Sequence, residues 1–210
     1  RRITFTRDSL GTYIDENGIL KYAPNNTPRF DHDPITGESL GLLIEENRTN
    51  LFTYSEDFSN AAWTKSGATI TANSTTAPDG TTTADKLVEN SANTAHHINE
   101  FYSNGLNPNT IYSYTVFVKA AERTHCTVQL YGNSQRLGIA INLSTGAIVQ
   151  TDTSNTTLLS SSVIPFPNGW YKVTLIGSGN TNNTYGLYIA GVSLWDGVGN
   201  TVWQDGKSYQ

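Results

Sequence analysis

The chain has no methionine and only one cysteine among its 210 residues. Because Cys126 stands alone, no disulfide can form within the chain, and its stability has to come from a packed core. The missing initiator methionine and the abrupt Arg-Arg start favour a segment of a longer polypeptide. No secretory signal peptide is visible at the start.

Charged residues are also scarce, at 15% of the chain, and they sum to a net charge of −5. A protein that binds a nucleic-acid backbone needs a surplus of Lys and Arg on one face, which this composition argues against. No apolar run is long enough to cross a bilayer, and no basic amphipathic helix would lie on a membrane surface. We therefore expect neither nucleic acid nor a membrane as a partner.

Turn-forming residues are abundant instead, and they punctuate the first fifty residues. Asn17-Gly18 stands between two short apolar runs in TYIDENGILKY, the strongest short-range signal for a β-hairpin. A second hairpin is expected around Pro34 to Gly37 in FDHDPITGESLGLLIEE. Residues 1–49 are thus predicted to form a small β-hairpin arm that packs on the rest of the chain or on a neighbouring chain.

Residues 50–210 are predicted to form an antiparallel β-sandwich, so that the whole protein is all-β. Strand candidates recur at steady intervals and are separated by turn residues such as Pro78-Asp79-Gly80. The predicted strands are 68–72, 84–89, 96–101, 111–120, 127–131, 137–143, 147–150, 157–165, 170–177 and 185–195.

Several of these segments alternate between apolar and polar residues, which predicts one face toward the core. In YSYTVFVKA, Tyr114, Val116 and Val118 share the inward face, while Phe117 and Lys119 share the other. The outward faces are mostly polar but carry an occasional aromatic ring, which a merely solvated face rarely needs.

Two resemblances involve these segments. NLFTYSEDFSNAAWT, IYSYTVFVKA, NGWYKVTL and GLYIAGVSLW resemble, in order and spacing, the opening, paired and closing strands of jelly-roll carbohydrate-binding modules. FTRDSLGTYIDENGILKYA, together with NTPRFDHDPITGESLGLLIEENRTNLFTYSEDF and AAWTK, resembles a segment of tailed-bacteriophage fibre and spike proteins. The resemblance implies a jelly roll on a virion-surface protein, often a homotrimer, that touches host or environmental glycans. It also implies that Phe52, Phe58 and Trp63 plug one end of the sandwich.

A glycan site is expected on the concave sheet face, where outward rings could contact the apolar side of a sugar. The alternatives are a solvated face or one covered by the arm. The predicted ligand-binding residues are Phe117, Lys119, Gln129, Tyr131 and Lys172, with His97, Asn99 and Arg136 at the rim.

Other groups carry less specific signals. Trp195 and Trp203 are either exposed sugar platforms or buried anchors. Related jelly rolls hold a structural calcium ion, for which Glu56 and Asp57 would supply ligands here. The closing strand departs from that pattern, since Ala190-Gly191 replaces the expected acids.

Catalysis is not expected. The run Asp31-His32-Asp33 combines acid and imidazole, but it lies at a predicted turn, where Asp caps its own backbone. We predict a non-catalytic carbohydrate-binding module on a virion surface. The alternatives are a structural or trimerisation module of a fibre, and a polysaccharide lyase or depolymerase.

Overall fold

The computed structural model describes residues 4–92, 94–102, 110–132, 135–179, 187–194, 202–203 and 208–209. The regular structure in these ranges consists of antiparallel strands, apart from one 3₁₀ turn at Pro167–Gly169. Within the same ranges, no helix has the length and apolar character that crossing a membrane requires. The prediction of an all-β, antiparallel protein is confirmed.

The N-terminal arm is built from two hairpins, as predicted. Their strands are β1 (Gly11–Ile14) with β2 (Leu20–Ala23), and β3 (Phe30–His32) with β4 (Ser39–Leu42). Asn17-Gly18 lies in the first turn, where Gly18 has a φ of +76° and a Cβ would fall 2.2 Å from the Pro34 carbonyl oxygen. Only glycine tolerates both conditions, which explains why the signal at this position was reliable.

The run Asp31-His32-Asp33 holds the two hairpins together and closes the second turn. An Asp31 carboxylate oxygen accepts a 2.7 Å hydrogen bond from the Ile14 N–H, and His32 Nδ1 lies 3.0 Å from the Ile14 carbonyl oxygen. Asp33 accepts hydrogen bonds from two backbone N–H groups of its own turn, and these bonds lower the pKa of its carboxyl. The prediction of a turn role for this run is confirmed at Asp33.

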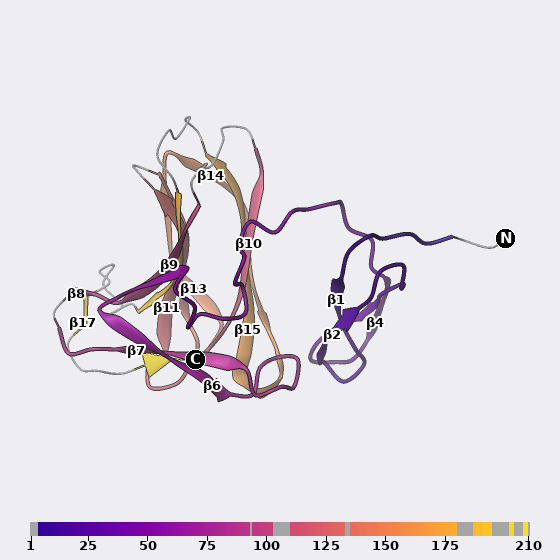
Figure 1. Cartoon of the computed structure of the whole chain (residues 1–210), viewed down its shortest axis with the longest axis horizontal. Coiled ribbons are helices and arrows are strands. Elements are labelled where there is room, and N and C mark those ends of the chain that lie inside the picture. The colour runs from indigo at the N-terminus through magenta and orange to yellow at the C-terminus, as the bar shows by residue number, and fades with distance from the viewer. Residues whose placement is uncertain are drawn as a thin grey trace.

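Two larger sheets follow the arm (Figure 1). The three-stranded sheet has the order β10 (Tyr112–Lys119), β15 (Trp170–Gly179) and β14 (Thr156–Pro165). The six-stranded sheet has the order β13 (Ala147–Ser154), β12 (Gln135–Asn142), β11 (His125–Gly132), β16 (Leu187–Leu194), β9 (His97–Tyr102) and β5 (Trp63–Ser66). Each of the predicted strands from residue 111 onward corresponds to one of these strands.

Smaller sheets lie beside them. One contains β18 (Ser208–Tyr209), β7 (Ala84–Glu89) and β6 (Ala68–Thr75), and another pairs β17 (Val202–Trp203) with β8 (Thr94–Ala95). The predicted strands at 68–72 and 84–89 match β6 and β7. The short strands β8, β17 and β18 were not predicted.

The main core is shared by the two larger sheets. The three-stranded sheet contributes Tyr114, Val116, Val118, Val173 and Leu175, and the six-stranded sheet contributes Ile98, Cys126, Val128, Leu130, Leu137, Ile139 and Ile141. Each of the larger aliphatic side chains contributes about 1.5–3 kcal/mol relative to an exposed position. The inward faces predicted for β10, β11 and β15 are confirmed at these residues.

The aromatic segment before β5 closes this core. Trp63 is buried, Phe52 stacks on it at 5.5 Å between ring centroids, and Phe58 meets it edge-on at 4.9 Å. The Trp63 indole N–H donates a 2.8 Å hydrogen bond to the Tyr54 carbonyl oxygen. The three rings therefore have the packing role predicted for them, and β5 begins at the innermost one.

A second, smaller cluster joins the arm to the outer face of the three-stranded sheet. Ile14 from β1 packs with Phe166 and Trp170, and Phe117 borders them with its ring edge-on to Phe166 at 5.1 Å. One further link is the 3.1 Å hydrogen bond from the Leu20 N–H to the Pro78 carbonyl oxygen. The arm thus covers part of a sheet face that alternation alone would leave exposed.

Candidate functional site

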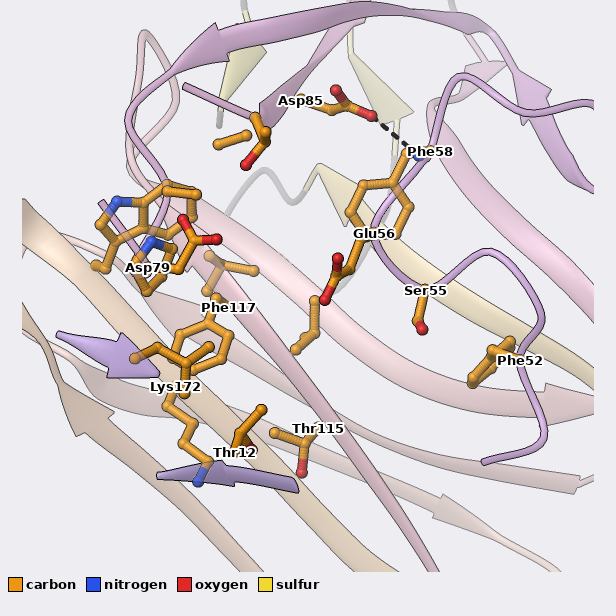
Figure 2. Close-up of a pocket in the computed structure, with 18 of the residues that line it drawn as sticks. Thr12, Phe52, Ser55, Glu56, Phe58, Asp79, Asp85, Thr115, Phe117 and Lys172 are labelled. Carbon is orange, nitrogen blue, oxygen red and sulfur yellow. Dashed lines mark hydrogen bonds between the residues drawn. The ribbon is translucent and has the colours of Figure 1, made fainter. Parts of the chain in front are cut away.

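A cavity of about 500 Å³ lies where the arm, the aromatic segment, the 77–85 loop and the three-stranded sheet meet (Figure 2). Its volume is within the range of small-ligand sites. Its lining residues include aromatic rings and a similar number of polar and charged side chains. The lining is Thr12, Leu20, Tyr22, Phe52, Ser55, Glu56, Phe58, Trp63, Ile70, Ala77, Pro78, Asp79, Thr83, Ala84, Asp85, Leu87, Ile98, Tyr114, Thr115, Val116, Phe117, Val118, Trp170 and Lys172.

The strand β10 runs through the middle of this cavity. It is an edge strand: it pairs with β15 and with no other strand in the described ranges. All five residues from 114 to 118 line the cavity, so it extends around the edge from the core side to the outer face. The free edge of such a strand presents backbone N–H and C=O groups that can bind hydroxyl groups.

Rings border the cavity on both sides of β10. Phe52, Phe58 and Trp63 lie on the core side, while Phe117 and Trp170 lie on the outer side. Figure 2 shows the Phe117 ring between Lys172 and the 77–85 loop. A pyranose ring has apolar C–H faces, so a cavity with rings on opposite sides suits a sugar better than a flat sheet does.

The polar groups of the cavity are carboxylates, hydroxyls and one ammonium. Glu56 Oε1 accepts a 2.7 Å hydrogen bond from the Tyr22 hydroxyl, which links the aromatic segment to the arm. Burial, followed by the hydrogen bond and charge of Glu56, raises the pKa of Tyr22, so this phenol remains a neutral donor. Asp85 accepts the backbone N–H of Phe58 at 2.9 Å and that of Asn73 at 3.0 Å.

Three of the eight predicted ligand-binding residues lie on the outer face of the three-stranded sheet. Phe117 pairs directly with Lys172 across β10 and β15, and both side chains line the cavity. Lys119 lies outside the lining, where its ammonium is 5.9 Å from the centroid of the Trp170 ring. Two of the predicted residues therefore belong to the candidate site.

The other five predicted residues lie on the six-stranded sheet: His97, Asn99, Gln129, Tyr131 and Arg136. They alternate with inward residues of β9, β11 and β12, so their register positions face away from the core. The two groups of predicted residues thus lie on different sheets. The structure does not bring all eight together on one concave surface.

The individual environments of these five residues differ. Asn99 is only 4% exposed, which restricts its access to a ligand. His97 is half-buried, and burial together with the neighbouring His96 lowers its pKa. Arg136 is exposed, with its guanidinium 3.5 Å from Asp152, and it pairs with Tyr131 across β11 and β12.

The residues predicted to bind calcium do not form a suitable donor set. Glu56 is engaged with Tyr22, and Asp57 accepts hydrogen bonds from the N–H and hydroxyl of Ser59. Across the described ranges, three or more His, Cys, Asp or Glu side chains nowhere gather as they would around a metal ion. An ion that needs clustered oxygen ligands does not fit these residues.

The alternatives stated for the two tryptophans near the end of the sequence stay predictions. Trp195 lies outside the described residues, and Trp203 is placed only as a position in the short strand β17.

Comparison of the chain with known protein families and with curated proteins finds no match. The properties of the cavity are therefore the basis for a functional proposal.

Sequence reasoning missed Asp79, Asp85 and the arm residues of the cavity. Asp79 was interpreted only as part of the Pro78-Asp79-Gly80 turn, and Asp85 only as a position in a strand. Tyr22 gave no signal, since its contact with Glu56 joins residues 34 positions apart. The density of aromatic residues around 52–63 and the outward positions of Phe117 and Lys172 were the features that pointed to this region.

Proposed function

We propose that the chain is a non-catalytic carbohydrate-binding module of jelly-roll type, carried by a virion-surface fibre or spike protein of a tailed bacteriophage. The observation that carries the binding proposal is the cavity around β10. It combines rings on two sides with carboxylates, hydroxyls, an ammonium group and a free strand edge. These are the groups that hold the apolar faces and the hydroxyls of a sugar.

The jelly-roll assignment draws its support from the way the two larger sheets share one core. Strands distant in sequence are neighbours in them: β9 lies between β5 and β16, β16 lies beside β11, and β10 lies beside β15. Such long-range antiparallel connections are typical of double-sheet jelly rolls. The virion location and the glycan partner rest on the resemblance of residues 3–65 and 50–200 to phage and carbohydrate-binding segments.

Binding without turnover is favoured by how the carboxylates are used. Asp85 accepts two backbone N–H groups, and Glu56 accepts a phenol, so both have structural partners. The single thiol is fully buried in the core, where burial raises the pKa of Cys126. We therefore assign these groups to packing and hydrogen bonding, and to neither a general acid nor a nucleophile.

A glycan array followed by paired variants tests the proposal. Thr115 and Ser113 are both exposed on the same face of β10, but only Thr115 lines the cavity. Thr115→Trp should fill the cavity and abolish binding of the glycans that the array identifies, whereas Ser113→Trp should retain it. Binding that survives Thr115→Trp, or release of shortened products from the glycan, would contradict the proposal.

An assembly role is the second candidate, and one feature of the arm favours it. The hairpin of β3 and β4 turns Phe30, Leu40 and Leu42 outward, with exposed fractions of 57%, 64% and 39%. Its polar face, with Asp31, points instead toward β1. A homotrimer that covers this apolar face, with no glycan bound by any variant, would favour a purely structural module.

A further inference from the structure

We propose that the cavity around β10 selects sugars that carry a free, protonated amine, and that it disfavours sugars with carboxylate or sulfate groups. This inference rests on the proposed glycan-binding function and names the chemical class of the ligand. It is based on the balance of charge in the lining, in which carboxylates outnumber the ammonium group.

The lining contains three carboxylates, Glu56, Asp79 and Asp85, and one ammonium, Lys172. All four groups belong to different elements: the aromatic segment, the 77–85 loop, β7 and β15. The negative charges therefore come from separate segments of the chain, and the positive charge comes from the three-stranded sheet. Figure 2 shows the Glu56 and Asp79 carboxylates on opposite sides of the space above Phe117.

Two of the carboxylates keep an oxygen available for a ligand. Glu56 uses Oε1 to accept the Tyr22 hydroxyl, and Asp79 uses Oδ1 to accept the N–H and hydroxyl of Thr81. The remaining oxygens, Glu56 Oε2 and Asp79 Oδ2, have no hydrogen-bond partner among the residues that the structure describes. Charge-assisted hydrogen bonds from an ammonium to such oxygens are stronger than those from a neutral hydroxyl.

The aromatic rings of the lining also favour a cationic sugar over an anionic one. The faces of Phe117 and Trp170 carry negative potential, which attracts a cation located above the ring. Lys119 already uses the Trp170 ring in this way, with its ammonium 5.9 Å from the ring centroid. An anionic sugar would instead meet carboxylates and ring faces of the same sign, with Lys172 as the one favourable lining charge.

Chitosan and chitin pentasaccharides provide a matched pair of probes, because they differ in the free or acetylated state of the same amines. Calorimetric titration at about pH 5.5 keeps most of the chitosan amines protonated. We expect the chitosan oligomer to bind at least about tenfold more tightly than the chitin oligomer, a difference of about 1.4 kcal/mol. Equal affinity of the two oligomers would overturn the inference and leave the glycan-binding proposal in place.

Variants that remove the charge of single side chains test whether the preference for a free amine arises in the cavity. Glu56→Gln keeps the oxygen that accepts the Tyr22 hydroxyl, and it should weaken chitosan binding severalfold without changing chitin binding. Lys172→Gln removes the opposing charge and should strengthen chitosan binding. Glu38→Gln is the control, since Glu38 is exposed on the arm and outside the cavity.

The affinities of these variants show whether the amine preference or the proposed glycan binding itself is wrong. An equal loss for Glu38→Gln and Glu56→Gln would indicate non-specific attraction to a protein of net charge −5, and would overturn the inference. Weaker chitosan binding by Lys172→Gln would also overturn it. If neither oligomer nor any array glycan binds the unmodified chain, the proposed function itself fails.

Discussion

Replacing Ile14 by alanine should release the arm from the three-stranded sheet without unfolding the rest of the protein. Ile14 is 7% exposed and packs with Phe166 and Trp170 in a cluster that is separate from the main core. The remaining described hydrogen bonds from the first hairpin to the body are few, among them the Leu20 N–H to Pro78 and the Tyr22 hydroxyl to Glu56. The docking of the arm therefore depends strongly on this one side chain.

The size of the effect is set by the atoms removed. Isoleucine to alanine deletes three carbons, each of which contributes about 0.8 kcal/mol when buried, or about 2.4 kcal/mol in total. The void left behind adds to this loss, so the expected range is about 2–5 kcal/mol. For about 2.4 kcal/mol, the equilibrium between docked and undocked arm shifts by about fiftyfold, since about 1.4 kcal/mol corresponds to a factor of ten.

Hydrogen exchange at a single amide reports this equilibrium directly. The Leu20 N–H donates to Pro78 across the junction, so it exchanges only when the arm undocks. Ile14→Ala should accelerate its exchange about fiftyfold or more, while amides of β15 exchange as before. Leu40→Ala, at a position that is 64% exposed on the same arm, should leave the Leu20 rate unchanged. An unchanged Leu20 rate in Ile14→Ala, or equal acceleration in β15, would refute the reasoning.

Three further predictions concern the body of the protein. Arg123→Ala should lower the free energy of unfolding by about 3–5 kcal/mol in urea titrations, because it leaves the Glu89 carboxylate buried without the guanidinium now 2.6 Å from it. Adding Glu89→Ala should restore part of this loss, and a further equal loss would contradict the assignment. Cys126 should not react with thiol reagents until the protein unfolds, because its side chain is fully buried and burial raises the pKa of the thiol. Rapid labelling of Cys126 in the folded chain would argue against the described core. Burial and the neighbouring His96 lower the pKa of His97 in the folded protein. The His97 imidazole therefore binds a proton more tightly in the unfolded chain, so the free energy of unfolding declines as the pH falls below about 6.5. His97→Gln should flatten the urea-measured unfolding free energy between about pH 7 and 5, and an unaltered slope would show that other groups dominate.

Local patterns in the sequence were sufficient to predict most of the strands. Asn17-Gly18 identified the first hairpin because its turn needs a residue with positive φ. The alternation around Val116 and around Val173 assigned the inward faces correctly, since a strand places alternate side chains on opposite sides. These signals depend on neighbours along the chain, which is why they could be interpreted without the structure.

The site could be predicted only in part, because its residues meet through contacts that are distant in sequence. Phe117 and Lys172 were selected correctly as outward residues of adjacent strands. The same alternation also selected Gln129, since a strand pattern identifies a face but not the sheet to which that face belongs. That the arm lies over Phe117 depends on Ile14, more than a hundred residues earlier, and no local pattern encodes such docking.

The location of the bound sugar tests the central claim most directly. The oligosaccharide that binds most tightly on the glycan array should be titrated into labelled protein while the backbone amide shifts are recorded. We predict that the largest changes fall on residues 114–118 of β10 and on the adjoining residues of the arm, around Tyr22. Changes confined to β11 and β12 around Gln129 and Arg136, or no glycan-dependent changes at all, would contradict a binding cavity between the arm and the sheet.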